Sequence, residues 1–270
     1  MRVFLAIGIV LMTLARTDAA EPLIVAHRGA SADAPENTLP AFKLAFRQGA
    51  DAIEGDFRLT ADGQIVCIHD ADTKRVAGAK LVVAKSTLQQ LRTLDVGLWR
   101  GVQFKGTTIP TFAEVLAVVP AGKLIYVEVK GPATMVPRLL EEIGRSGLRN
   151  EQVVLIAFDA GVIRAAKDKA PQLKGCWLSG FEKDGWGRVT PSLKTILATL
   201  KQTGANGFSS SHEIISEPVV RRIQKEGYEY HVWTVDDLNV AKRFRRWGAG
   251  SITTNVPAYI KKGISPIRSR

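Results

Sequence analysis

The sequence predicts a (β/α)8 barrel, the closed α/β fold in which eight parallel strands alternate with helices. Two observations lead to this prediction. Short apolar runs alternate with amphipathic stretches of helical length from residue 23 to residue 260, and such alternation is typical of a parallel sheet. Eight repeats within about 235 residues also match the usual size of this barrel. A chain of 270 residues can bury a large core without disulfides.

The strands are predicted where short runs of apolar, often β-branched residues lie between polar segments. These runs are Ile24–His27, Ala52–Asp56, Leu124–Lys130, Val153–Phe158, Gly175–Ser179, Asn206–Ser210, Tyr230–Val235 and Ser251–Thr254. Amphipathic stretches of helical length separate most of them. The predicted helices are Thr38–Gln48, Phe112–Val119, Val136–Gly147, Val162–Ala170, Leu193–Thr203, Glu217–Glu226 and Asp237–Trp247.

One further run, Gln64–His69, follows the second strand too closely to be its parallel neighbour, because a parallel crossover needs a dozen or more residues. The link ends in Asp62-Gly63, a strong hairpin signal. We therefore expect Phe57–His69 to form a hairpin arm, and residues 71–110 to form an insertion before the next helix. The whole excursion spans about residues 57–110 of a single domain, residues 20–270.

The first residues resemble a secretory signal peptide. Met1-Arg2 is followed by an apolar stretch and then by small residues around Ala19, after which we place the cleavage. The apolar stretch is too short to span a bilayer comfortably, and no later segment has the length of a transmembrane helix. The sequence thus predicts an exported protein, periplasmic or secreted. Cys67 and Cys176 both lie in apolar runs, which favours two buried free thiols over a disulfide.

The net charge of +11 is compatible with phosphate, anionic lipid or nucleic acid as a partner. Aromatic residues do not alternate with Lys and Arg, as they do in single-strand binding platforms. Nucleic acid is therefore not an expected ligand, and oligomeric state is not readable from the sequence.

Polar residues at the ends of the predicted strands indicate where chemistry occurs, because barrel active sites lie at the C-terminal ends of the strands. The residues at these ends are His27 and Arg28, Glu54 and Asp56, His69 and Asp70 on the hairpin arm, and Glu128 and Lys130. Strand side chains alternate faces, so Glu54 and Asp56 point the same way, as do Glu128 and Lys130. The two pairs can converge at the barrel mouth.

This set of residue types predicts a phosphodiester site. Three crowded carboxylates repel one another unless a cation lies between them, and oxygen ligands suit Ca²⁺ or Mg²⁺. Two histidines on separate elements suit an acid–base pair near neutral pH. Arg28 and Lys130 supply positive charge for a phosphate. Arg28 must lie in the loop for this role, since a regular strand would point it away from the barrel axis.

The sequence resembles the glycerophosphodiester phosphodiesterase family in an ordered set of motifs over nearly the whole chain after the leader. The matches are His27-Arg28-Gly29, Pro35-Glu36-Asn37-Thr38, Gly49-Ala50-Asp51, Glu54-x-Asp56, Thr60-x-Asp62-Gly63, His69-Asp70, Ile109-Pro110-Thr111, Glu128-x-Lys130, Trp233-Thr234-Val235 and Thr254-Asn255-x-Pro257. Departures are Gly55, Ala157 and Asp236, where the family usually has a large apolar residue, Ser and Asn. At Gly55 we expect weaker strand packing or a bulge.

The resemblance implies metal-dependent hydrolysis of a glycerophosphodiester, such as glycerophosphocholine, to glycerol 3-phosphate and an alcohol. It implies that His27 and His69 are the acid–base pair, that Glu54, Asp56 and Glu128 bind one divalent cation, and that Arg28 and Lys130 contact the phosphate. Trp233 is either barrel core or a substrate contact that flanks choline through a cation–π interaction. The choice between Ca²⁺ and Mg²⁺, the order of the two histidines, and attack by water or by the glycerol hydroxyl stay open.

Several alternatives remain beside this interpretation. Phospholipase D-like or phosphatidylinositol-specific phosphodiesterases share a two-histidine barrel, and Trp99, Phe104 and Trp186 lie in excursions that could form an apolar rim for lipids. A barrel glycosidase needs only paired carboxylates, and a binding barrel with a relic site should have lost a site position. We expect structural roles for His212 and His231, helix capping by Asn37 and Thr38, and a structural turn at Thr254-Asn255. Glu36 is expected to join the site from its loop.

Overall fold

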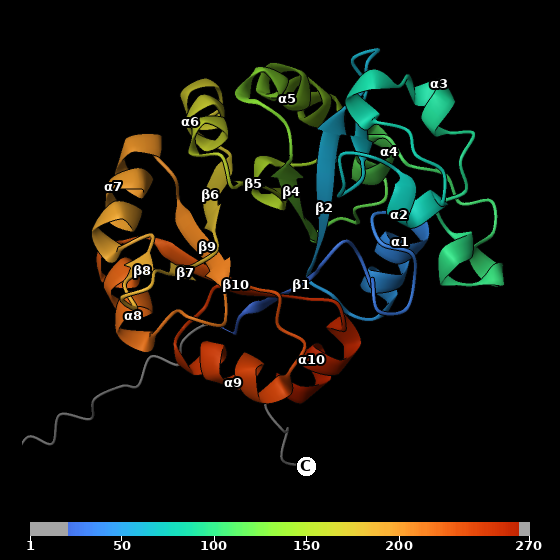
Figure 1. Cartoon of the computed structure of the whole chain (residues 1–270). Coiled ribbons are helices and arrows are strands. Elements are labelled where there is room, and N and C mark those ends of the chain that lie inside the picture. Colours follow the sequence, from blue (N-terminus) through green and yellow to red (C-terminus); the bar gives the residue numbers. More distant parts are fainter. Residues whose placement is uncertain (1–20, 265–270) are drawn as a thin grey trace, which may run out of the picture.

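Eight parallel strands close into a barrel in the computed structural model, which describes residues 21–264 (Figure 1). The strand order is β1-β2-β4-β5-β6-β9-β10-β11, and β11 pairs with β1 to close the barrel. The strands are β1 (Leu23–Ala26), β2 (Ala52–Leu59), β4 (Leu124–Val129), β5 (Val153–Ala157), β6 (Lys174–Ser179), β9 (Gly207–Ser211), β10 (Glu229–Trp233) and β11 (Ser251–Thr254). The predicted (β/α)8 fold is confirmed.

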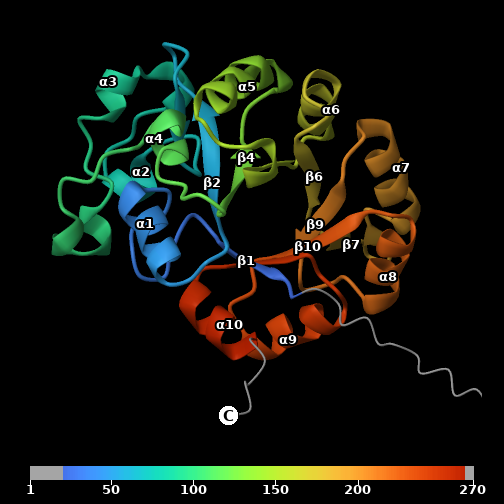
Figure 2. The same ribbon diagram turned by 180° about the vertical axis from the view of Figure 1, so that it is seen from behind.

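Helices form a ring around the strands, as both views show (Figures 1 and 2). They are α1 (Leu39–Arg47), α4 (Phe112–Leu116), α5 (Val136–Arg145), α6 (Ala160–Lys169), α7 (Leu193–Thr203), α8 (Glu217–Lys225), α9 (Leu238–Arg246) and α10 (Pro257–Ile264). The last helix was not predicted, because Gly263 lowers the helical propensity of a short segment. Gly263 instead allows close packing, since a Cβ there would lie 2.4 Å from Leu238 Cδ1. No helix among residues 21–264 is long and apolar enough to cross a membrane.

The excursion after the second strand is present as predicted. Strand β2 continues to Leu59 and pairs in antiparallel register with β3 (Ile65–Cys67), with Phe57 opposite Cys67. Gly63 in the turn has φ 74°, which favours glycine. The insertion that follows contains α2 (Lys74–Ala77), η1 (Val83–Lys85), α3 (Leu88–Leu91), η2 (Leu98–Arg100) and η3 (Val102–Phe104). It buries a small apolar core of its own: Val66, Ile68, Val76, Val83, Leu91, Val96 and Ile109.

A second excursion, the hairpin of β7 (Glu182–Lys183) and β8 (Val189–Thr190), follows β6. The sequence did not predict it, because two-residue strands are too short to show an alternating pattern. Gly55, where a bulge was expected, lies in a regular stretch of β2 paired with β4. A Cβ at Gly55 would lie 3.2 Å from both Cys67 Sγ and Phe42 Cζ, so packing there is tight and not weak. That expectation was wrong.

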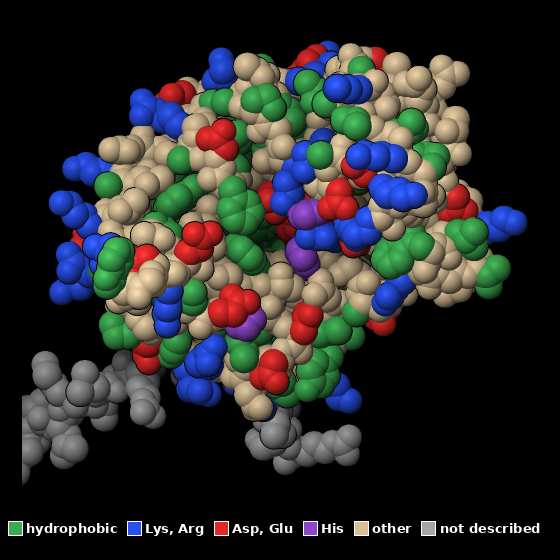
Figure 3. All heavy atoms as spheres, in the orientation of Figure 1, with side chains coloured by type: hydrophobic (Ala, Val, Ile, Leu, Met, Phe, Trp, Pro, Cys, Tyr) green, Lys and Arg blue, Asp and Glu red, His purple; other side chains and the backbone are tan. Residues whose placement is uncertain are grey.

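The strands carry apolar side chains on both faces. Their outer faces pack against the helices in the main core, and their inner faces bury Val25, Ala52, Tyr126, Val154, Ile156, Cys176 and Leu178. Cys67 and Cys176 are buried free thiols, as predicted. The predicted signal peptide, residues 1–19, lies outside the described residues. The barrel mouth opens on the face shown in Figure 3, where histidine side chains lie in a hollow between acidic and basic groups.

Candidate active site at the barrel mouth

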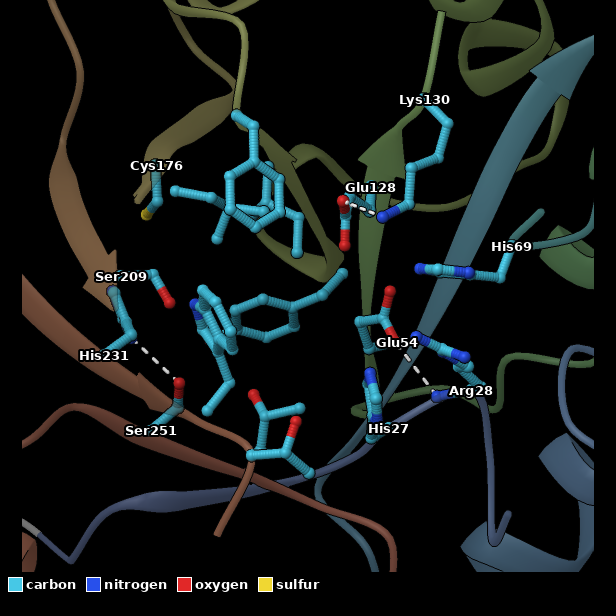
Figure 4. A pocket seen from close by; sticks show the side chains of 17 residues that line it. His27, Arg28, Glu54, His69, Glu128, Lys130, Cys176, Ser209, His231 and Ser251 are labelled. Carbon is cyan, nitrogen blue, oxygen red and sulfur yellow. Dashed lines mark hydrogen bonds and ion pairs between the residues drawn. The ribbon is translucent and has the colours of Figure 1, made fainter. Parts of the chain in front are cut away.

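The barrel mouth holds a cavity of about 150 Å³. Seven of the eight residues predicted for the site line it: His27, Arg28, Glu54, His69, Glu128, Lys130 and Trp233 (Figure 4). The eighth, Asp56, is buried and contacts the two cations of the site. These residues are far apart in the sequence, from His27 to Trp233. They converge because they lie at or near the carboxyl ends of strands in the same sheet.

Three carboxylates form the acidic part of the site. Glu54 and Asp56 occupy alternate positions on β2, and Asp56 is paired with Glu128 in the β2–β4 register. Each of the three offers a carboxylate oxygen that lies within 4.8 Å of the other two. All three residues are buried, with exposed fractions of 2%, 1% and 7%. So much negative charge away from water needs compensating positive charge.

The carboxylates titrate differently because their neighbours differ. Burial, followed by the charges of Asp56 and Glu128, raises the pKa of Glu54 well above its usual range. Burial and Asp56 raise the pKa of Glu128 to about 7. Burial opposes ionisation of Asp56 too, but the cations of Lys130 and Arg28 outweigh it and lower its pKa. Asp56 is thus the carboxylate that the side chains of Lys130 and Arg28 neutralise. The positive charge around Glu54 and Glu128 is not enough to keep their pKa values in the usual range.

Lys130 and Arg28 contact different oxygens of Asp56. Lys130 Nζ lies 2.5 Å from Glu128 Oε1 and 3.2 Å from Asp56 Oδ1. Arg28 Nε lies 3.2 Å from Asp56 Oδ2, and its backbone N–H donates to Glu54 Oε2 at 2.9 Å. Arg28 has φ 56°, a left-handed conformation outside the strand. Arg28 therefore lies in the loop after β1, as a phosphate contact requires, and its guanidinium reaches the cavity.

A hydrogen-bond chain fixes the tautomer of His27. Asn255 Nδ2 donates to Asp236 Oδ2 at 2.6 Å, and a carboxylate accepts only. Asn255 must therefore turn its carbonyl oxygen toward His27 Nδ1, 2.8 Å away. Nδ1 carries the proton and Nε2 keeps its lone pair when the ring is neutral. Burial, with the adjacent Arg28 charge, lowers the pKa of His27 and favours this neutral form.

His69 is held in a similar way by a different partner. Its Nδ1 lies 2.7 Å from Asp70 Oδ1. The pKa of Asp70 is lowered to about 2, chiefly by its hydrogen bond from Arg75. Arg75 also donates twice to Glu36, at 2.7 and 2.8 Å, and Glu36 accepts from Arg28 Nη1 at 2.9 Å. A continuous polar chain therefore connects the insertion to the barrel mouth.

The wall facing the charged groups is apolar and aromatic. Trp233 packs edge-to-face on Phe158, with ring centroids 5.6 Å apart. Lys130 Nζ lies 5.6 Å from the centroid of Phe158. Trp233 belongs to the cavity wall and also packs against the inner apolar cluster of the barrel. Trp233 thus packs against the barrel core and faces the cavity, and its contact with substrate stays a prediction.

Some residues behave differently from the sequence interpretation. Thr38 caps α1 as expected, but Asn37 does not: its Nδ2 donates to Asp56 Oδ2 at 2.8 Å, and its Oδ1 accepts from the Asp56 N–H at 3.1 Å. Asn255, expected to form only a turn, contacts His27. Glu36 joins the site as expected.

Phe158 and Arg75 were missed as members of the site. Phe158 follows β5 directly, so its place at a strand end could have indicated a cavity residue. Arg75 shows no such signal, because only the folded insertion brings it to Asp70. His212 lies outside the cavity, with Nε2 3.6 Å from Glu213. His231, expected to be structural, lines the cavity, and its Nδ1 lies 2.9 Å from Ser251 Oγ.

The acidic cluster fits a divalent cation. Glu54 Oε1 is buried and has no hydrogen-bond partner among the described residues, and an unsatisfied buried charge is costly. The donors are all oxygens, which suit hard cations such as Ca²⁺ and Mg²⁺. A cation beside Glu54 would also remove the repulsion that raises the pKa of this residue.

Comparison with known proteins adds an independent observation. Residues 27–259 match the model of the glycerophosphoryl diester phosphodiesterase family. The chain is 31% identical over 240 residues to a glycerophosphodiester phosphodiesterase of Caldanaerobacter subterraneus, covering 87% of this chain and 94% of the relative. It is 28% identical over 260 residues to one of Bacillus subtilis, covering 89% and 87%.

A solved structure shares the fold. This is an Oleispira antarctica phosphodiesterase in complex with the product sn-glycerol-3-phosphate, with a TM-score of 0.81 at 24% identity. The similarity covers 90% of this chain and 97% of the other. The fold agreement thus extends over nearly all of the described residues.

Proposed function

The chain belongs to the glycerophosphoryl diester phosphodiesterase family, and it is therefore a phosphoric diester hydrolase acting on glycerophosphodiesters. From this premise we propose that His27 and His69 carry out the proton transfers that cleave the phosphodiester at the barrel mouth, beside carboxylates that would hold one divalent cation. The observation that carries this proposal is the arrangement of the site. Two histidines, each with Nδ1 held by a partner, flank three buried carboxylates and two cations. The products are glycerol 3-phosphate and an alcohol.

His27 and His69 perform the proton transfers. His27 favours its neutral form and leaves Nε2 free, so it suits removal of a proton from the attacking oxygen. That oxygen, from water or from the neighbouring glycerol hydroxyl, forms a bond to phosphorus. His69, held by Asp70, gives a proton to the leaving alkoxide as its bond to phosphorus breaks. With the glycerol hydroxyl as nucleophile, a cyclic phosphate forms and water then opens it.

Glu54, Asp56 and Glu128 would hold the divalent cation, either Ca²⁺ or Mg²⁺. When bound, the cation neutralises phosphoryl oxygens and makes phosphorus more electrophilic. Arg28 and Lys130 contact the remaining phosphoryl oxygens, since both cationic groups line the same cavity. Lys130 is already positioned there by Asp56 and Glu128.

Glycerophosphocholine suits the cavity because its cationic head group can lie against aromatic faces. Trp233 and Phe158 form such a wall. We further propose that the N-terminal leader directs the protein to the periplasm or out of the cell. Lysophospholipid hydrolysis is a second candidate, favoured by Trp99 and Trp186, which are 47% and 84% exposed. Phe104, expected in the same apolar rim, is half-buried.

Release of glycerol 3-phosphate from glycerophosphocholine tests the proposal. The mature protein is assayed after EDTA treatment and after adding back Ca²⁺ or Mg²⁺. We expect metal-dependent release that is lost in His27→Ala and His69→Ala and is retained in His212→Ala, a matched control outside the site. Folded protein that releases no glycerol 3-phosphate with either metal would contradict the choline substrate, and activity unaffected by EDTA would contradict the metal.

A further inference from the structure

We propose that the protein docks peripherally on anionic lipid surfaces through an apolar knob on its insertion, formed by Leu98, Trp99 and Val102. The hairpin tip at Trp186, on the other side of the barrel mouth, is a second contact point. These four residues are 49%, 47%, 77% and 84% exposed, and they are among the few large apolar side chains that the described residues leave open to solvent. Exposed apolar patches on a soluble fold commonly mark an interaction surface.

The knob is built to present its side chains and is not a loose loop. Asp95 accepts backbone hydrogen bonds from Gly97, Leu98 and Gly106, which closes the segment on itself. Trp99 Nε1 donates to Val96 O at 2.8 Å. The polar atom of the indole is thus satisfied within the knob, and the exposed ring remains for apolar contact. None of the three knob residues belongs to the small core of the insertion.

The hairpin tip is organised around Asp184 in the same manner. Asp184 accepts from the backbone N–H groups of Trp186 and Arg188 at 2.9 Å each, and from Arg188 Nε at 2.6 Å. The Arg188 guanidinium lies 5.1 Å from the Trp186 ring centroid. An exposed Trp beside an Arg is typical of membrane–water interfaces, where the ring lies at the head-group level and the cation meets phosphate.

The positive charge of the insertion favours an anionic lipid surface as the partner. Residues 71–110 contain seven Lys or Arg residues against two Asp and no Glu. Arg75 and Arg92 are ion-paired with carboxylates outside this segment, so the basic character comes from the remaining cations. Arg100 and Lys105 flank the knob and are exposed. Clustered cations near a membrane are attracted by anionic lipid. This is the combination of apolar anchor and basic surround that favours peripheral attachment.

Both contact points lie on the side of the molecule that carries the active site. The insertion and the β7–β8 hairpin each leave a strand at its carboxyl end. In Figure 3 the cavity lies between these two excursions, and apolar side chains gather on both sides of it with basic groups beside them. Docking would therefore turn the cavity toward the lipid head groups.

Lipid binding of this kind goes beyond the proposed function and does not depend on it, because binding needs no turnover.

Co-sedimentation with lipid vesicles tests the proposal. The mature protein is mixed with vesicles of phosphatidylcholine alone or of phosphatidylcholine with phosphatidylglycerol, and the bound fraction is measured at increasing salt. We expect binding to the anionic vesicles that weakens with salt. Because burying one large apolar side chain is worth about 1.5–3 kcal/mol, Trp99→Ala with Val102→Ser should weaken binding at least about tenfold. Trp186→Ala should weaken it in the same direction.

Tyr259→Ala is the matched control, since Tyr259 is 56% exposed on α10, away from both excursions. We expect this variant to bind as the wild type does, and all variants to hydrolyse glycerophosphocholine at the wild-type rate with unchanged Tm. Absence of wild-type binding to anionic vesicles, or equal loss in the Tyr259 variant, would overturn the proposal. Concentration-dependent self-association that disappears in the knob variant would assign the surface to a second copy of this chain instead.

Discussion

Substitution of Asn255 by Ala tests how the site orients His27, the proposed catalytic base. Asn255 Oδ1 holds His27 Nδ1 at 2.8 Å, and Asn255 is itself held by Asp236. Removing the amide leaves a half-buried ring N–H without a partner and frees the ring to exchange tautomers. The tautomer with its proton on Nε2 cannot accept a proton there. We therefore expect slower catalysis without loss of the fold.

The size of the effect follows from the lost hydrogen bond. A buried donor left unsatisfied costs about 1–3 kcal/mol, and each 1.36 kcal/mol of barrier is about tenfold in rate. We expect kcat/KM to fall by about 10–100-fold. The hydrogen bond that His27 donates to Asn255 also raises the pKa of His27 against burial and Arg28, so its removal lowers this pKa further below 6.5. Activity requires the neutral ring, and the acid limb of the pH profile should therefore move to lower pH.

The assay is the pH profile of kcat/KM for glycerol 3-phosphate release, with Tm measured in parallel. Ser31→Ala is the matched control, because Ser31 Oγ donates to the same Asn255 oxygen at 2.9 Å but does not hydrogen-bond to His27 itself. This variant should stay within about twofold of wild type, as expected for one partly exposed hydrogen bond. An Asn255→Ala enzyme with wild-type kcat/KM and an unmoved acid limb would refute the reasoning.

Three further perturbations have defined outcomes. Glu54→Gln removes a buried carboxyl group whose pKa is raised, so the metal-free protein should gain about 1 kcal/mol of stability. The rise in Tm on adding Ca²⁺ or Mg²⁺ should become smaller, and an unchanged metal dependence of Tm would contradict metal binding by Glu54. Asp70 has a depressed pKa, so its contribution to stability is present above 3.8 and is lost as pH falls toward about 2; Arg75→Ala should move acid unfolding, followed by circular dichroism, to higher pH. Gly29→Ala should cost more than 1 kcal/mol in urea unfolding, because Gly29 has φ 82° and a Cβ there would lie 2.6 Å from the backbone of Ala41; Gly63→Ala, at φ 74° with open space, is the control and should cost less.

The sequence predicted the barrel because its strands repeat a strong local pattern. Strands such as Val153–Ala157 and Ser251–Thr254 are short runs of buried residues between more polar segments. The alternation of strands and helices then allows few sheet topologies. Helix α10 and the β7–β8 hairpin escaped prediction for the opposite reason. Their segments are short, and tertiary packing, such as Gly263 on Leu238, determines them.

The candidate site was predictable where function coincides with a strand end, and less so elsewhere. Glu54 and Glu128 occupy register positions that a strand pattern fixes. Asn37 was predicted to cap a helix because it stands directly before one in the sequence. In the structure its side chain binds Asp56 instead, and the local sequence does not distinguish the two roles. Arg75 gave no signal, because its partners Asp70 and Glu36 come from separate loops that only the folded chain brings together.

The placement of His69 has a consequence for how this enzyme could be re-engineered. His69 follows β3, outside the eight barrel strands, and the insertion that supplies Arg75 begins directly after it. In the proposed mechanism, one of the two proton-transferring histidines is therefore supplied by a peripheral module with its own apolar core. A barrel trimmed to its eight strands and helices would keep the carboxylates, Arg28 and Lys130, and it would be a phosphate-binding protein without a complete catalyst. Exchange of this module between related barrels is a route to new substrate preference only where the replacement restores the histidine, its aspartate and the arginine together.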